Sequence, residues 1–399
     1  MPRSQETGRR KLHRVAGGAV GDTMGGMSAP APTSLDETLR RFSAASAPEL
    51  ARDLGDGRIQ CLACGHRCRI AEGNCGVCRV RFVEGGVLRR PKNYVGAAAC
   101  DPIEKKPFFH AYPARTALTF GMLGCDLHCG YCQNWITSQA LRDEDAVAPP
   151  RPVEAAELAR EAKRCGARVL ASSYNEPLIT ADWAVEVFAE ARRLGLDCAF
   201  ISNGNGTPEV LRYLRPYVNL YKVDLKGFTD RAYRDLGGKL SNVLDTIRDL
   251  KQLGYWVEIV TLVIPGFNDE PAELRDLARF LAGVDRDMPW HVTAFHPDYK
   301  MTDRGRTAVK TLLDAYDIGL EAGLRFVYPG NVPGQVGNRE NTCCPACGEA
   351  VVLRRGFLVL ENRMRGGSCG RCGAAIPGVW EETPPARTEG SGRPSPVNI

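Results

Sequence analysis

Three cysteines share one short stretch, GMLGCDLHCGYCQNW, at residues 121–135. Cys125, Cys129 and Cys132 stand at C-x3-C-x2-C spacing, and no fourth cysteine lies close to them in the sequence. Thiolates hold cubane iron–sulfur clusters, and clusters that only transfer electrons take four of them. Three thiolates would therefore leave one iron of a 4Fe-4S cluster open to an outside ligand. Tyr131, directly before the last cysteine, offers a flat aromatic face for an adenine.

A structural zinc loop is the alternative for these three cysteines. Structural zinc takes four protein ligands, commonly from paired C-x2-C knuckles. The stretch has one such pair and no fourth ligand of the same kind, so its spacing favours the iron–sulfur cluster.

A second group of metal-ligand residues lies upstream, in CLACGHRCRIAEGNCGVCRVR at residues 61–81. Its members are Cys61, Cys64, His66, Cys68, Cys75 and Cys78. The two C-x2-C pairs would suit a tetrahedral zinc, with the middle cysteine or the histidine as a substitute, and an auxiliary iron–sulfur cluster is the alternative. A hairpin with Gly85-Gly86 at its turn is predicted to follow. Few residues are available for a core, so we expect a small module held together by its metal.

A third group lies near the C-terminus, on both sides of the predicted hairpin VVLRRGFLVLENRM. Its two C-x2-C-G knuckles are Cys344 with Cys347 and Cys369 with Cys372, and Cys343 is left over. Two knuckles on a small β scaffold are typical of a zinc ribbon. Basic and aromatic residues do not alternate here, so nucleic acid is not the expected partner.

Between these groups, short apolar strands alternate with amphipathic helices. Strands are predicted at 116–123, 168–174, 196–203, 220–226, 256–264, 290–295 and 324–330, and helices at about 152–165, 180–194, 207–214, 240–253, 271–283 and 306–322. Repeated units of this kind predict a parallel sheet with right-handed crossovers, wound open or closed as a barrel.

Polar residues follow the predicted strands at their C-terminal ends. They are Tyr174-Asn175-Glu176-Pro177, Ser202-Asn203-Gly204-Asn205, Asp224-Leu225-Lys226, Pro265-Gly266-Phe267-Asn268 and His296-Pro297. In a βα barrel the loops at this end converge on one mouth. The cysteine loop follows the first strand, so we expect it to open on the same face.

Composition limits the class of protein. The chain has 399 residues, a formal charge of +5 and 16 cysteines. The charge is small for this length and does not indicate nucleic acid or a membrane surface as a partner. No apolar segment resembles a signal peptide or a membrane span, so we read the thiols as reduced metal ligands in a cytoplasmic protein. Three isolated cysteines are expected as buried core thiols: Cys100, Cys165 and Cys198.

Five segments follow from these observations. They are a disordered tail with a short helix at 1–50, a Cys-rich metal-binding module at 51–100, the α/β core at 101–335, a zinc-ribbon-like module at 336–380 and a disordered tail at 381–399.

With these motifs in view, the chain resembles the radical S-adenosylmethionine (radical SAM) enzymes of the AmmeMemoRadiSam system, a branch close to the pyruvate formate-lyase activating enzymes. The resemblance covers about Cys61 to Trp380 and rests on DPIEKKPFFH, GCDLHCGYCQNWITSQ, SYNEP, VDLKGF, IPGFND, FHPDY and VYPGNVPG. It implies an α/β fold, a partial (β/α)6 radical SAM barrel.

The resemblance also implies roles for individual residues. Cys125, Cys129 and Cys132 would ligate the 4Fe-4S cluster, and Tyr131 would touch the SAM adenine. The remaining SAM contacts would come from Asn175, Glu176, Ser202, Asn203, Asp224 and Lys226, with His296 near the substrate. Related proteins commonly carry cysteines matching Cys61, Cys64, Cys68 and Cys78, which leaves Cys75 as an extra residue.

The implied reaction is reductive cleavage of SAM to a 5′-deoxyadenosyl radical, which then abstracts hydrogen from a substrate. Activating enzymes direct this radical at a partner protein. The implied partners are thus a reducing electron donor, a protein substrate, and Memo-like and AMMECR1-like proteins as functional associates. The alternative hypothesis is a non-catalytic, metal-stapled binding or electron-transfer protein on the same scaffold.

Overall fold

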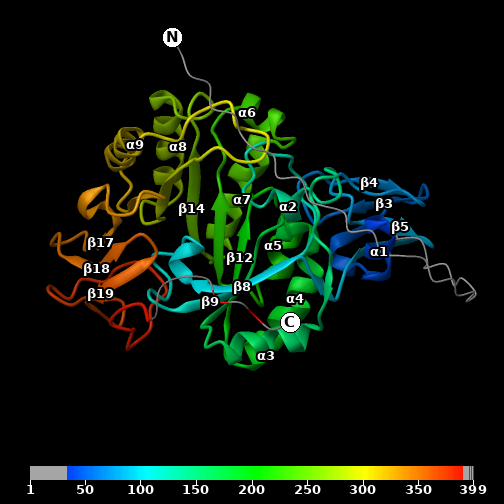
Figure 1. Cartoon of the computed structure of the whole chain (residues 1–399), viewed down its shortest axis with the longest axis horizontal. Helices are drawn as coiled ribbons and strands as arrows, with labels where there is room; N and C mark the ends of the chain where they lie inside the picture. The colour runs from blue at the N-terminus through cyan, green and yellow to red at the C-terminus, as the bar shows by residue number, and fades with distance from the viewer. Residues whose placement is uncertain (1–33, 390–394, 396, 398) are drawn as a thin grey trace, which may run out of the picture. The chain divides into compact units, whose positions relative to one another are not determined.

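An open sheet of eight strands is the largest element of the computed structural model, which describes residues 34–389, 395, 397 and 399 (Figure 1). The strand order is β16-β15-β14-β13-β12-β11-β9-β8, and every neighbouring pair is parallel except β8 with β9. The strands are β8 (Ala97–Pro102), β9 (Thr116–Gly121), β11 (Val169–Ser172), β12 (Asp197–Ser202), β13 (Leu220–Asp224), β14 (Trp256–Val263), β15 (Trp290–Ala294) and β16 (Val327–Gly330). Within the described residues no ladder joins β16 to β8, so the sheet does not close.

Helices connect the parallel strands in the predicted alternating order. They are α2 (Trp135–Ser138), α3 (Ala155–Arg164), α4 (Ala181–Arg193), α5 (Pro208–Leu214), α6 (Asp230–Asp235), α7 (Leu240–Gln252), α8 (Pro271–Val284) and α9 (Val309–Glu321), with η2 (Ile103–Lys105) and η3 (Pro177–Thr180) as short 3-10 turns. Local sequence signals determine where several of these helices begin. At α5, the Thr207 side chain accepts the Val210 N–H at 3.1 Å, and Pro208 occupies the first turn.

The two faces of the sheet carry different side chains because successive residues of a strand point to opposite sides. On β9, Leu118 and Phe120 belong to the large core that the helices share. Ala117 belongs to a smaller core on the other face, together with Ile103 and Phe108. The predicted alternation of strands and helices is therefore confirmed as a mixed α/β fold.

The N-terminal part is built from short strands. Its elements are α1 (Leu35–Arg41), β1 (Ser43–Ala45), η1 (Pro48–Leu50), β2 (Ala51–Asp53), β3 (Arg58–Cys61), β4 (Arg69–Ala71), β5 (Phe82–Glu84), β6 (Val87–Pro91), and β7 (Tyr94–Val95), which pairs with β10 (Arg151–Pro152). The predicted hairpin is confirmed as β5 and β6, with Gly85 and Gly86 both at positive φ in the turn.

The C-terminal part has two small antiparallel sheets. Its elements are η4 (Gly337–Glu340), β17 (Thr342–Cys343), β18 (Ala350–Arg355), β19 (Leu358–Asn362), β20 (Met364–Arg365) and β21 (Ser368–Cys369). The predicted hairpin is confirmed as β18 and β19. Val351, Val359 and Ile376 of this part share a core with Phe109 and Tyr328, so the small sheets pack against one end of the large one.

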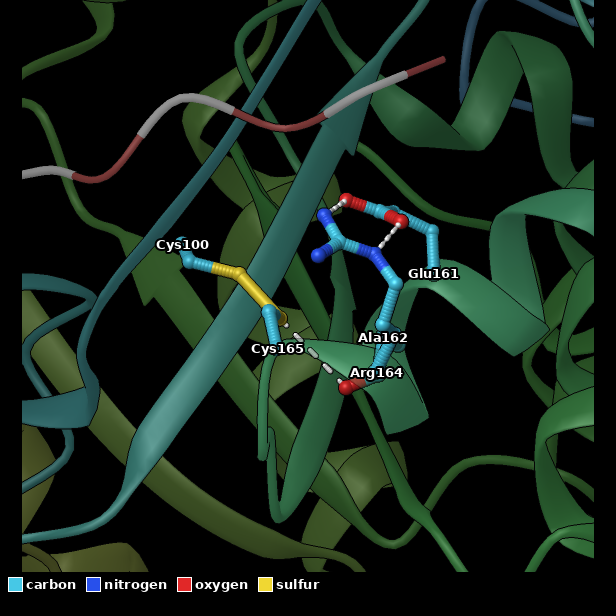
Figure 2. Close-up of a disulfide and its surroundings, with 5 residues drawn as sticks. All are labelled: Cys100, Glu161, Ala162, Arg164 and Cys165. Carbon is cyan, nitrogen blue, oxygen red and sulfur yellow. Dashed lines mark hydrogen bonds and ion pairs between the residues drawn. A yellow bond between two sulfur atoms is a disulfide. The ribbon is translucent and has the colours of Figure 1, made fainter.

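Two of the cysteines that we expected as separate core thiols are joined. Figure 2 shows the disulfide between Cys100 on β8 and Cys165, which directly follows α3. The expectation was wrong for this pair. The two cysteines are 65 residues apart in the sequence, and only the folded structure brings the end of α3 beside β8. Cys198 is fully buried and unpaired, as expected.

Residues 1–33 of the first predicted tail and residues 390–394, 396 and 398 of the second lie outside the described residues. In the described part of the second, the Thr388 N–H donates to the Val359 carbonyl at 2.9 Å. Of the helices that are described, none has both the length and the apolar composition needed to cross a membrane.

Candidate functional site

A cavity of about 390 Å³ opens at the C-terminal ends of the parallel strands. The loop after β9 and the turns after β11, β12 and β13 line it, together with Lys105, Lys106 and Asn331. The predicted site residues in the lining are Cys125, Cys129, Tyr131, Cys132, Asn175, Glu176, Asn203, Asp224 and Lys226. Such a volume is typical of small-molecule sites. The structure thus brings nine of the predicted residues to one place.

All three cysteines of the loop line the cavity. The Leu127 N–H donates to Cys125 Sγ at 3.3 Å, and Cys132 Sγ lies 3.2 Å from the Ser138 hydroxyl. Burial raises the pKa of Cys129 to about 11, which a bound cation would reverse. Three thiols, two of them with hydrogen bonds to sulfur, fit an iron–sulfur cluster with one open iron.

Glu176 is held at the base of the cavity by both of its oxygen atoms. Oε1 accepts the Ser202 hydroxyl at 2.7 Å and the Leu178 N–H at 3.1 Å, and Oε2 accepts the Asn203 N–H at 2.7 Å. Burial, together with the nearby Asp126 carboxylate, raises the pKa of Glu176 to about 8. The carboxylate therefore ties the turn after β11 to the turn after β12.

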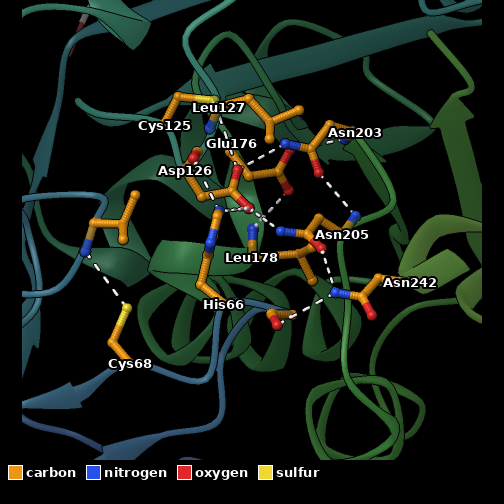
Figure 3. A network of polar contacts seen from close by, with 12 residues as sticks. His66, Cys68, Cys125, Asp126, Leu127, Glu176, Leu178, Asn203, Asn205 and Asn242 are labelled. Atoms are coloured by element: carbon orange, nitrogen blue, oxygen red, sulfur yellow. Dashed lines mark hydrogen bonds and ion pairs between the residues drawn. The ribbon is translucent and has the colours of Figure 1, made fainter. Parts of the chain in front are cut away.

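Asp126 is a site residue that the sequence analysis missed. It directly follows Cys125 and is fully buried. Figure 3 shows its carboxylate between two asparagines: Oδ1 accepts from Asn203 Nδ2 at 2.7 Å and Oδ2 from Asn205 Nδ2 at 2.8 Å. His66 of the Cys-rich segment reaches the same residue, with Nε2 3.1 Å from the Asp126 carbonyl oxygen. An acidic residue inside the cysteine motif was the only local signal for this network.

Two lysines face the half-buried carboxylate of Asp224. Lys222 is hydrogen bonded to Oδ1, and Lys226 Nζ lies 3.6 Å from Oδ2. Burial opposes ionisation of Asp224, but the two lysines outweigh it and lower the pKa of the carboxyl group. Asp224 carries one negative charge, and the two lysines carry two positive charges. The net positive charge can bind an anionic ligand. Lys222 was not predicted.

A second lysine cluster borders the cavity on the side of β8. Lys106 Nζ lies 2.7 Å from Asp101 and 3.2 Å from the Tyr174 hydroxyl. Tyr174 adopts a φ of 65°, a conformation that costs a bulky residue energy and is commonly retained at functional sites. Neither residue was proposed from the sequence as a ligand contact.

Two predicted residues lie beside the cavity and not in its lining. Ser202 is buried under Glu176, as described above. His296 is exposed, and its Nε2 lies 3.1 Å from Nε2 of Gln133, which does line the cavity.

The C-terminal cysteines converge on one point. The sulfur atoms of Cys344 and Cys372 are 3.7 Å apart, and those of Cys347 and Cys369 are 3.8 Å apart. A tetrahedral metal with bonds of about 2.3 Å to sulfur places its ligands about 3.8 Å apart. These four residues can therefore hold a single metal ion, and the exposed Cys343 is not among them.

Comparison with known proteins gives consistent likenesses. A family model described as the radical SAM superfamily matches residues 120–281, which include the cysteine loop and the turns after β11 to β14. "Uncharacterized protein MJ0808" of Methanocaldococcus jannaschii is 35% identical over 327 residues, 81% of this chain and 96% of the relative. The pyruvate formate-lyase-activating enzyme of Staphylococcus aureus is 26% identical over 53% of this chain and 88% of the relative. A radical SAM methyltransferase structure from Sphaerobacter thermophilus aligns with a TM-score of 0.43 at 18% identity, over 55% of this chain and 68% of that one.

Proposed function

We propose, on the premise that the chain belongs to the radical SAM superfamily, that its cavity binds a 4Fe-4S cluster and SAM and that the chain is a radical SAM enzyme. One observation carries the proposal: three thiols and a set of polar strand-end residues, far apart in sequence, line a single cavity. A non-catalytic protein on the same scaffold would have no need to keep both the three thiols and the polar residues.

The cluster ligands in this proposal are Cys125, Cys129 and Cys132. When bound, the cluster would supply one electron to SAM, and SAM would supply the 5′-deoxyadenosyl radical that takes hydrogen from the substrate. Lys226 provides a positive charge for the SAM carboxylate, and Tyr131 an aromatic face for its adenine. Glu176 holds together the turns after β11 and β12, which carry Asn175 and Asn203, since both of its oxygens are already bonded within the protein.

The cavity wall also controls solvent. Val260 and Leu262 of β14 also line it, and Phe357 of the β18–β19 hairpin contributes from the C-terminal part. Apolar walls exclude water, which protects a reactive intermediate from side reactions.

The substrate belongs to the proposal as well. The likeness to activating enzymes supports a partner protein as hydrogen donor and an external one-electron reductant. The motifs shared with the AmmeMemoRadiSam branch extend the proposal to association with Memo-like and AMMECR1-like proteins. We further propose that the C-terminal cysteine group binds a structural zinc ion, because its sulfur spacing matches tetrahedral zinc.

The test is anaerobic. Protein reconstituted with iron and sulfide is reduced with dithionite, mixed with SAM and assayed for 5′-deoxyadenosine, and the electron paramagnetic resonance (EPR) signal of the reduced cluster is recorded with and without SAM. We expect 5′-deoxyadenosine and a SAM-dependent change of signal from the wild type and from Cys75→Ser, and neither from Cys129→Ala. A cluster-loaded wild type whose signal ignores SAM and which forms no 5′-deoxyadenosine would contradict the proposal.

A further inference from the structure

The five cysteines of the N-terminal segment differ in their exposure. Cys61, Cys64 and Cys78 are buried and Cys68 is half-buried, whereas Cys75 is exposed. The thiol groups of Cys64, Cys68 and Cys78 each interact electrostatically with that of Cys61, so these four lie near one another. They form one set, at positions 61, 64, 68 and 78, and the exposed fifth cysteine is left out.

Hydrogen bonds hold the chain at three of these four residues. The Cys61 N–H donates to the Cys68 carbonyl at 2.8 Å across the β3–β4 ladder, and the Arg67 N–H closes a turn on the Cys64 carbonyl at 3.1 Å. The Val77 N–H donates to Cys68 Sγ at 3.5 Å, the kind of contact that stabilises a metal-bound thiolate. The chain around Cys61, Cys64 and Cys68 is thus held by contacts that need no metal.

The sulfur spacing of this set differs from that of the C-terminal group. Across the described part of the chain, the C-terminal group is the one set of three or more ligand atoms that lie within 4.8 Å of one another. The four N-terminal sulfurs are therefore spread more widely than a single tetrahedral zinc allows, as are the three of the loop at 125–132. Wider spacing is what a cubane cluster requires, because each thiolate binds a different iron.

An apolar shell encloses this set on one side. Cys61 shares a buried cluster with Ala63, Ile70, Val83 and Leu88, and Cys68 packs against it. Such a shell limits solvent access and is one of the means by which proteins tune iron–sulfur centres.

The same segment also touches the cysteine loop of the cavity. A Cβ added to Gly124, the residue before Cys125, would lie 3.3 Å from the Cys78 carbonyl oxygen, so the two backbones are in contact. Arg142 joins them a second time, with Nη2 donating to the Val77 carbonyl at 2.6 Å and Nη1 to the Leu127 carbonyl at 3.0 Å. His66 joins them a third time through Asp126 (Figure 3).

We propose that Cys61, Cys64, Cys68 and Cys78 bind a second 4Fe-4S cluster, packed against the loop that carries the first cysteine group. The site has four protein ligands and so has no open iron, which assigns it to electron transfer or structure and not to SAM binding. This inference goes beyond the proposed function, because it does not depend on the cavity binding SAM.

The experiment counts metal and sulfide in full-length protein purified anaerobically and reconstituted with iron. The wild type should contain about eight iron, about eight sulfide and about one zinc per chain, from two cubanes and one zinc site. In the triple variant Cys125→Ala, Cys129→Ala, Cys132→Ala, about four iron and four sulfide should remain. In Cys61→Ala, Cys64→Ala the count should also be about four iron, and Cys75→Ser should match the wild type.

The outcomes separate the two proposals. A triple variant with no iron and about two zinc would overturn the second cluster and leave the first intact. A triple variant with undiminished iron would overturn the cluster in the cavity and leave the second intact. Should a variant fail to fold, low-temperature EPR of the reduced wild type decides: two signals, of which SAM changes one, are expected, and a single signal overturns the inference.

Discussion

The carboxylate of Glu176 accepts the backbone N–H of Asn203 at 2.7 Å, and this bond fixes the turn after β11 to the turn after β12. Both turns line the cavity. The shape of the cavity therefore depends on a hydrogen bond within the protein. The two atoms that form this bond need not contact a ligand.

Glu176→Gln should weaken SAM binding without removing the cluster. The amide of glutamine turns a donor toward either the Asn203 N–H or the Leu178 N–H, and a buried unsatisfied donor costs about 1–3 kcal/mol. We expect the dissociation constant for SAM to rise by about tenfold or more. Anaerobic equilibrium dialysis with labelled SAM measures it, with Glu157→Gln on the exposed face of α3 as the matched control. Unchanged affinity would show that the Glu176 bonds do not shape the site.

Asp126→Asn should lower cluster occupancy. An asparagine can accept from one of the two side-chain amides that now donate to Asp126, but it presents an NH2 group to the other. The loop after Cys125 would lose one of the hydrogen bonds that hold it. The negative charge near His66, 3.9 Å from its Nε2, would also be removed. Iron content and the rate of 5′-deoxyadenosine formation should both fall. Asp145→Asn, on an exposed turn, should leave both at the wild-type level.

Loss of the proposed C-terminal zinc should destabilise the adjoining core. Cys344 and Cys369 belong to the same buried cluster as Phe109 and Tyr328, so a loosened knuckle disturbs the packing against the large sheet. Cys347→Ser should lose about one zinc per chain and lower the melting temperature. Metal analysis and thermal unfolding measure the two effects. Cys343→Ser, whose residue lies outside the group, should retain the zinc, and a loss of zinc there would show that the ligand set is different.

Acidification should destabilise the protein through His110. Its Nδ1 lies 2.7 Å from the Pro377 carbonyl and its Nε2 2.6 Å from the Tyr328 hydroxyl, a pattern that suits a neutral ring. Burial lowers the pKa of His110 from 6.5 to about 4, although Glu258 opposes the shift. The depressed pKa means that the unfolded chain binds the proton first, so the stabilisation is present above about pH 6.5 and is lost as the pH falls toward about 4.

The wild type should thus lose about 1 kcal/mol of unfolding free energy from this group between about pH 7.5 and about pH 5.5. The His110→Gln variant should have a lower free energy of unfolding at neutral pH. That free energy should lack the pH dependence that His110 contributes. Denaturant unfolding followed by tryptophan fluorescence measures both, since Trp380 lies 5.4 Å from the His110 ring. Parallel pH profiles for the two proteins would contradict the assignment.

Much of the α/β core could be predicted because its signals are local. The helix predicted at 180–194 is α4 at Ala181–Arg193, since apolar periodicity and the flanking residues are enough to define it. The polar strand ends could be placed on one face for the same reason, because parallel strands share a direction.

The contacts that the sequence did not reveal join residues far apart in the chain. The residues around Cys100 and Cys165 gave no sign that the two cysteines pair. Asp126 could not be told from other acidic residues by sequence alone, because its partners lie in the folded turns after β11 and β12. Long-range contacts of this kind depend on the assembled fold, which no short stretch of sequence encodes.

Phe357 gives the C-terminal part a role in the cavity. This side chain, at the turn between β18 and β19, lines the same cavity as the cysteine loop, about 230 residues earlier in the chain. The cavity therefore extends across the boundary between the large sheet and the small C-terminal sheets. A chain cut after β16 would keep every proposed ligand of the cluster and of SAM, but its cavity would lose Asn331 and Phe357 from the lining.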